Sequence, residues 1–245
     1  MKRLIAASLL LLGLAGCGGS SQPYSTDFFA MDTFMSVKVL AKDGESLAQQ
    51  CESEINSLES VLSRTREDTD IAKLNAADGA EVTLSDEGAK LLSLALDLSA
   101  ATNGAYDPTV APLTDLWGIG TDNARVPAQS EIDEALSHVG YENIKLLGDN
   151  QVKLENGAQV DLGGIGKGYA GDVVHEMAES DTSDQWHVLA RLSGNVEMYG
   201  GKTADSGTDN WNIGIADPDD NTDSIAVVSL ADGSVVTSGD YERYF

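Results

Sequence analysis

Two long stretches of apolar residues at helical spacing stand out along the chain. From Glu45 onward apolar residues recur every three or four positions, which lines one face of a helix. The residues on this face are Leu47, Cys51, Ile55, Leu58, Val61 and Leu62. A second amphipathic helix is predicted from about Asp86 to Thr102, where Asn103-Gly104 is a typical stop. Before the first helix, residues 34–40 alternate between apolar and polar, which predicts a half-buried strand.

The second half of the chain is dominated by short strand-like runs. Ser130 to Asp133 resembles a capping box and predicts a helix through His138, and a further helix is predicted from Gly163 to about Glu179. Strands are predicted at residues 144–147, 151–154, 159–162, 186–192, 196–199, 211–216, 225–230 and 234–237. Because helices cluster early and strands late, we expect an α+β fold of mixed, largely antiparallel sheets packed with helices.

The first residues have the pattern of an export signal. A basic start, Met1-Lys2-Arg3, precedes an apolar run, and Leu14-Ala15-Gly16-Cys17 then resembles the bacterial lipobox. We therefore expect residues 1–16 to be a lipoprotein signal peptide, Cys17 to carry the lipid, and residues 17–27 to tether a domain of residues 28–245 to a lipid bilayer. The protein would be extracytoplasmic and anchored to the bacterial membrane. The alternative is a plain secretory signal followed by a chance cysteine.

The charge balance excludes one class of partner. There are 40 Asp and Glu against 15 Lys and Arg, a formal net charge of −25 at pH 7. Such a surface repels nucleic acid, so we expect no nucleic-acid partner. An anionic ligand would need a local source of positive potential. The cysteine count is two, so lipidation of Cys17 would leave Cys51 without a disulfide partner.

The segment from Asp161 to Asp172, DLGGIGKGYAGD, is the strongest candidate for chemistry. A strand-like run leads into glycines and Lys167 where a helix is predicted to begin. Glycines let backbone N–H groups approach phosphate oxygens, the helix start adds partial positive charge, and the lysine adds a full one. The spacing matches neither the Walker pattern nor the dinucleotide fingerprint. A helix-starting turn with an exposed lysine is the alternative.

Five motifs in order carry a resemblance to a known family. They are Met31-Asp32-Thr33, residues 104–113 (GAYDPTVAPL), residues 161–172, residues 211–218 (WNIGIADP) and residues 237–241 (TSGDY). In this order they resemble the FAD:protein FMN transferase family, also called ApbE-like flavin transferases. The resemblance implies that fold, and an enzyme that cleaves FAD, releases AMP and attaches FMN by a phosphoester to a threonine or serine of an exported flavoprotein, such as a subunit of a membrane redox complex.

The resemblance also implies which residues bind FAD and Mg²⁺. The residues matching positions that contact FAD are Met31, Ala105, Tyr106, Asp107, Asp161 and Lys167. Gly164 matches a position whose backbone carbonyl binds the metal ion, and the remaining metal ligands would lie beyond residue 245. We therefore expect a chain shortened at its C-terminus, with weak or no activity on its own.

Several alternatives stay open. Asp161 also fits a strand-end residue that accepts backbone N–H bonds, Tyr106 a core aromatic residue, and Asp107-Pro108 a turn. Thr65 stands where many family members carry a tyrosine near the flavin, and Ser193 stands in a turn that is often Gly-Gly-Asp/Asn. An FAD pyrophosphatase of the same fold, or a flavin-binding lipoprotein without catalysis, therefore remains possible. His138, His175 and His187 have no metal-ligand spacing and are interpreted as structural.

Overall fold

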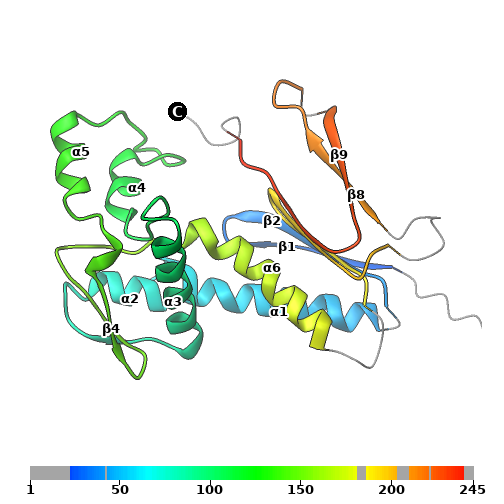
Figure 1. Cartoon of the computed structure of the whole chain (residues 1–245), viewed down its shortest axis with the longest axis horizontal. Helices are drawn as coiled ribbons and strands as arrows, with labels where there is room; N and C mark the ends of the chain where they lie inside the picture. Colours follow the sequence, from blue (N-terminus) through cyan, green and yellow to red (C-terminus); the bar gives the residue numbers. More distant parts are fainter. Residues whose placement is uncertain (1–22, 42, 181–185, 203–209, 221, 240–245) are drawn as a thin grey trace, which may run out of the picture.

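The computed structural model describes residues 23–41, 43–180, 186–202, 210–220 and 222–239. The predicted signal peptide, Cys17, and Asp240 and Tyr241 of the last motif lie outside the described residues. The prediction of an α+β fold is confirmed by helices packed against antiparallel sheets (Figure 1).

The central element is a five-stranded antiparallel sheet with the strand order β1-β2-β6-β7-β10. The bounds are β1 Tyr24–Ala30, β2 Thr33–Val39, β6 Val188–Leu192, β7 Asn195–Tyr199 and β10 Gly233–Val236. The boundary predicted at residue 28 was wrong, because residues 24–27 belong to β1 and pair with Ser36 to Val39 of β2. This strand escapes a hydrophobic pattern search because it is an edge strand that buries only Phe28 and Ala30.

Two long helices cover one face of this sheet. Helix α1 (Gly44–Leu62) and helix α6 (Gly163–Ser180) lie next to each other beneath it (Figure 1). The predicted apolar face of α1 is confirmed: Leu47, Cys51, Ile55 and Leu58 are buried in the main core. Burial raises the pKa of the Cys51 thiol to about 12, so this cysteine is a packing residue and not a nucleophile.

A second layer of helices and a small sheet lies at one end of the molecule (Figure 1). It contains helices α2 (Asp70–Ala76), α3 (Asp86–Ala101), α4 (Ala111–Trp117) and α5 (Gln129–Leu136), and a short 3-10 helix (Tyr141–Asn143). Strands β3 (Val82–Thr83), β5 (Gln151–Leu154) and β4 (Ile144–Gly148) form its sheet, in that order. The predicted start of α5 was misplaced: Ala128 is the N-cap, and its N–H donates to Glu131 at 2.8 Å in half of a capping box.

The strand predicted at residues 159–162 does not form. Apart from a single bridge between Gln159 and Val110, and the N–H of Asp161 donating to the carbonyl of Pro108 at 2.7 Å, the segment pairs with no strand of the described residues. Instead the side chain of Asn75 bonds both backbone groups of Val160, donating to its carbonyl at 2.8 Å and accepting from its N–H at 2.7 Å. The side chain of Asn75 thus takes the place of a neighbouring strand. Asp161 comes directly after this segment and two residues before the first residue of α6.

A two-stranded ribbon lies on the other face of the central sheet. Strands β8 (Trp211–Ala216) and β9 (Ser224–Leu230) pair with each other, and Trp211 packs on Leu40 and Met198 in a second small core. Within the described residues no helix is both long and apolar enough to cross a membrane.

Candidate flavin site

The start of α6 is organised by the carboxylate of Asp161. One oxygen of Asp161 accepts the Gly163 N–H at 2.8 Å, and the other accepts from Nε of Arg64 at 2.9 Å. The N–H groups of Ile165 and Gly166 donate to the carbonyl of Leu162. Asp161 therefore caps the helix in the way that its alternative interpretation predicted, and it stands where the partial positive charge of the helix is greatest.

Tyr106 packs directly on the glycines of this helix start. A Cβ atom at Gly164 would lie only 3.2 Å from Cε2 of Tyr106, so the close approach depends on the glycine. The Tyr106 hydroxyl is buried and has no hydrogen-bond partner in the described part of the chain. Burial, and then the charges of Asp161 and Asp107, raise its pKa to about 12. The hydroxyl therefore stays protonated and can donate a hydrogen bond to a ligand.

Asp107 is occupied in holding the segment that carries Tyr106. Its Oδ1 accepts from the N–H and the hydroxyl of Thr109 at 2.8 and 2.5 Å, and its Oδ2 accepts from the Tyr141 N–H at 2.9 Å. The turn interpretation of Asp107-Pro108 therefore describes this carboxylate well. Ala105, just before Tyr106, is exposed.

The turn between β1 and β2 reaches the same end of the sheet. Met31 and Asp32 both have left-handed backbone angles, with φ of 49° and 57°, as a tight hairpin requires. Met31 packs against the same apolar cluster as Tyr106 and Ile165. Met31, Tyr106 and Ile165 are therefore all anchored on the main core.

The turn between β6 and β7 joins Lys167 to this group. The half-buried Lys167 accepts at its backbone carbonyl a hydrogen bond of 2.9 Å from Nδ2 of Asn195. Ser193, which precedes it in the turn, has a φ of 66°, so a serine here takes a conformation that glycine adopts more readily. The carbonyl of Gly194 accepts from the N–H of Thr237 at 2.8 Å, which brings in the end of β10.

A cavity of about 650 Å³ opens between the central sheet and the β8–β9 ribbon. Ser193 and Gly194 line it, so the cavity and the α6 start share the β6–β7 turn. Three of the five motifs meet here. Their lining residues are Thr33, Asn212, Ile213, Gly214, Ile215, Ala216, Thr237 and Gly239.

The comparisons with known proteins match almost all of the chain. The model of the ApbE family matches residues 31–245. The chain belongs to the ApbE family.

Curated and solved relatives agree with this assignment. The FAD:protein FMN transferases of Treponema pallidum and Vibrio cholerae are 32% and 28% identical, with 96% and 100% of this chain and 70% and 74% of each relative covered. The crystal structure of the ApbE protein from Thermotoga maritima superposes with a TM-score of 0.84 at 35% identity, covering 91% of this chain and 72% of that one. The apo flavinyl transferase ApbE of Pseudomonas stutzeri superposes with a TM-score of 0.77 at 29% identity, covering 91% and 70%.

Sequence reasoning missed several residues that this ApbE-family fold brings to the site. Arg64 bonds Asp161, Asn195 bonds Lys167, and Phe34 and Arg191 line the cavity. Phe34 is 81% exposed, and a large aromatic residue at an outward position of a strand was a readable signal. Arg64 and Asn195 gave no such signal, because their roles depend on partners 97 and 28 residues away.

The described residues do not form a metal site by themselves. No group of three or more His, Cys, Asp or Glu side chains in the described ranges is arranged to hold an ion. Gly164 lies in the first turn of α6, where one lone pair of its carbonyl faces the helix and the other can meet a ligand. Gly164 therefore offers a single oxygen, and its role as a metal ligand stays a prediction.

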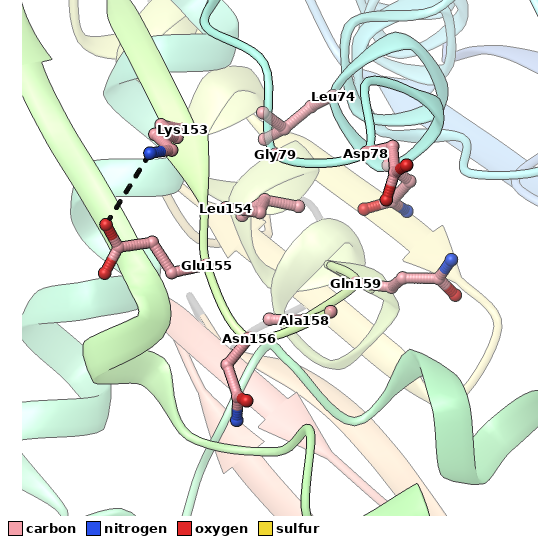
Figure 2. A pocket seen from close by; sticks show the side chains of 11 residues that line it. Leu74, Asp78, Gly79, Lys153, Leu154, Glu155, Asn156, Ala158 and Gln159 are labelled. Carbon is pink, nitrogen blue, oxygen red and sulfur yellow. Dashed lines mark ion pairs between the residues drawn. The ribbon is translucent and has the colours of Figure 1, made fainter.

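A second cavity lies away from the motifs (Figure 2). It has a volume of about 380 Å³ and lies beside α2 and the end of β5, with the Lys153–Glu155 ion pair at its edge. None of the predicted site residues lines it, so it is not the candidate site.

The three histidines contact protein groups, in line with their structural interpretation. Nδ1 of His138 lies 2.6 Å from the carbonyl oxygen of Asn156, and Nδ1 of His187 lies 3.0 Å from that of Gly201. Nδ1 of His175 lies 3.2 Å from the carboxylate of Glu197, which is only 8% exposed. This pair ties α6 to β7.

Glu197 should make stability depend on pH. Burial raises the pKa of its carboxyl group, His175 lowers it in part, and Asp172 and Asp232 raise it further. The folded state thus holds this proton more tightly than the unfolded chain does. The stabilisation is full below the unfolded pKa of about 4.3 and is lost as pH rises through the folded pKa. As pH rises through that window, the wild type should lose unfolding free energy relative to Glu197→Gln, which carries no titrating group at this position. Parallel pH profiles in urea unfolding would contradict this.

Proposed function

We propose that this chain is an FAD:protein FMN transferase that acts on exported flavoproteins. One observation carries the proposal: the ring of Tyr106 packs on Gly164 in the first turn of α6, and its buried hydroxyl has no hydrogen-bond partner among the described residues. A helix start of this kind favours phosphate, and an uncommitted donor beside it is suited to a phosphate oxygen. The cavity of about 650 Å³, which is linked to α6 through the β6–β7 turn, has room for an aromatic ring system.

The reaction is a transfer of a phosphoryl group with balanced bonds. The oxygen of a threonine or serine hydroxyl on the acceptor attacks the phosphorus of the FMN half. The bond from this phosphorus to the bridging oxygen breaks, AMP leaves with the electron pair, and the hydroxyl proton passes to AMP or solvent. In such a transfer the protein contributes mainly by placing the reactants and stabilising negative charge.

Each residue at the helix start has a part in that placement. The start of α6 contributes the partial positive charge of the helix, Tyr106 donates a hydrogen bond, and Lys167 supplies a positive charge against the acidic background of the chain. Dependence on Mg²⁺ is part of the proposal and rests on the family resemblance alone. Of the described residues, the resemblance assigns only the backbone carbonyl of Gly164 to the ion.

The acceptor assay is the direct test. The protein is incubated with FAD, Mg²⁺ and a candidate acceptor flavoprotein, and a parallel sample contains EDTA in place of Mg²⁺. The mass of the acceptor is then measured by mass spectrometry. Transfer adds the mass of FMN less one water. Release of FMN and AMP without a change in acceptor mass indicates a pyrophosphatase instead. Binding of FAD without turnover indicates a flavin carrier.

Lys167 should matter to FAD binding through its charge. Lys167→Ala should weaken FAD binding roughly ten- to a hundredfold, the value of a hydrogen bond to a charged group, and Lys167→Arg should weaken it less. The measurement is a titration of flavin fluorescence. Lys145→Ala is the control, because Lys145 is about half exposed and pairs with Glu155 at 3.7 Å, where the loss should be small. Equal affinity for both Lys167 variants and the wild type would contradict this role.

The membrane anchor at Cys17 is also a proposal, supported by the lipobox-like sequence before it. Cys17→Ser should release the protein from the membrane fraction when it is expressed in bacteria with its signal sequence. Mass spectrometry of the N-terminal peptide should find a diacylated or triacylated cysteine in the wild type. Retention of the variant in membranes, with an unmodified wild-type peptide, would disprove the anchor and leave the plain secretory signal.

A further inference from the structure

Arg64 joins three segments that are distant in the sequence. It follows α1 and lies in the loop before α2. Its Nε bonds Oδ2 of Asp161 at 2.9 Å, and its Nη1 bonds Oδ1 of Asp115 in α4 at 2.7 Å. The side chains of Arg64 and Asp161 are only 21% and 22% exposed, whereas that of Asp115 is 54% exposed. A planar guanidinium group holds two carboxylates in fixed directions, which a lysine cannot do.

Asp161 creates an electrostatic conflict at the helix start. Its negative charge stabilises α6 in the absence of a ligand, since a carboxylate at a helix N-terminus is favourable. The same charge repels the phosphates of a dinucleotide, in a chain whose formal net charge is already −25. Arg64 places its charge beside that carboxylate and offsets the repulsion at this point.

Arg64 stays charged under all working conditions. Burial lowers the pKa of its guanidinium group, but the hydrogen bonds and charges of Asp115 and Asp161 outweigh burial and raise that pKa. The positive charge is thus permanent, and no change in pH within the stable range switches it off.

We propose that Arg64 is a positioning residue of the flavin site, which fixes the Asp161 carboxylate at the start of α6 and offsets its charge against the diphosphate of FAD. This inference rests on the proposed function and deepens it. It assigns to Arg64 a part in FAD binding. Asp115, the more exposed partner, serves only to steady the guanidinium group.

The inference predicts coupling between Arg64 and Asp161 in FAD binding. Arg64→Met should weaken FAD binding roughly ten- to a hundredfold, since it removes a charged hydrogen bond and frees the carboxylate. Arg64→Lys should fall between Arg64→Met and the wild type. Once Arg64 is gone, Asp161→Asn should cost less affinity than it does in the wild type, because it then also removes an uncompensated charge. The two effects are therefore not additive.

The experiment is a double-mutant cycle with a matched control. FAD affinity is measured by flavin fluorescence, and thermal unfolding without FAD is measured in parallel, for the wild type, both single variants and the double variant. Asp115→Asn is the control, because it breaks the other ion pair of Arg64 and leaves Asp161 bonded. It should change the Kd for FAD by less than about twofold, below what a lost charged hydrogen bond costs. If Arg64→Met fails to fold, Arg64→Lys is compared with Asp115→Asn.

Two outcomes would overturn the inference. Additive effects of Arg64→Met and Asp161→Asn on FAD affinity would show that the two residues act separately. If an Arg64 variant binds FAD with the same affinity as Asp115→Asn, then Arg64 only forms a structural ion pair and has no part in FAD binding. A wild-type protein that binds no FAD would remove the proposed function as well, whereas wild-type binding and FMN transfer together with unaffected Arg64 variants would remove this inference alone.

Discussion

Gly200→Ala is expected to destabilise the protein by roughly 2–5 kcal/mol, the sum of a left-handed backbone penalty and of overpacking against rigid backbone. Gly200 follows β7 with a φ of +75°, and a Cβ atom there would overlap the backbone oxygen of Trp186. That oxygen belongs to buried main chain beside the start of β6, so the clash cannot be relieved by turning a side chain. Urea unfolding followed by tryptophan fluorescence measures the effect.

Gly120→Ala separates the two causes. Gly120 has a similar φ of +83°, but nothing lies within 4 Å of the position that its Cβ atom would take. It should lose only about 1–2 kcal/mol, the backbone penalty alone. If both variants lose the same free energy of unfolding, the approach of Trp186 to Gly200 contributes nothing and the main chain there adjusts freely.

The long helices α1 and α3 were readable from the sequence because each buries a complete face, whereas the seven-residue helices α2 and α4 were not predicted. In α1 the predicted positions Cys51 and Ile55 are fully buried, and in α3 Leu92 and Ala95 are as well. The strand predicted at residues 159–162 failed for a reason that no local pattern records: Asn75, 85 residues away, supplies both backbone hydrogen bonds of Val160. Strand β1 was missed for a different reason. It is an edge strand that buries only two side chains, so its sequence shows almost no alternation of apolar and polar residues.

The candidate site was predicted in its parts but not in its connections. The glycines before Lys167 gave the helix start, and the motif around Tyr106 was placed beside it only by the fold, through the contact with Gly164. The two hydrogen bonds that Asp107 accepts from Thr109 fit the predicted turn, whereas the one that it accepts from the N–H of Tyr141, 34 residues away, is predicted by no sequence pattern. Long-range side-chain partners therefore decide which motif residues face a ligand and which build the frame.

Tyr106→Phe should move stability and FAD affinity in opposite directions. A buried hydroxyl without a partner costs about 1–3 kcal/mol in the folded state, so its removal should leave the protein without FAD equally stable or more stable. The same change should weaken FAD binding roughly ten- to a hundredfold, because the phosphate loses a donor that is already desolvated. Thermal unfolding without FAD and a fluorescence titration with FAD measure the two effects.

Tyr169→Phe is the matched control for this prediction. Tyr169 is also buried, and it lies on α6, but its hydroxyl donates to the carboxylate of Glu87. Removal of the Tyr169 hydroxyl should lower the free energy of unfolding by about 1–3 kcal/mol, because the carboxylate of Glu87 loses its donor. The affinity for FAD should not change. Should Tyr106→Phe behave in the same way, with lower stability and unaltered FAD binding, then the Tyr106 hydroxyl is bonded to a buried water in the free protein. Tyr106 would then be the core aromatic residue of the alternative interpretation, and the phosphate site would have to be sought elsewhere along α6.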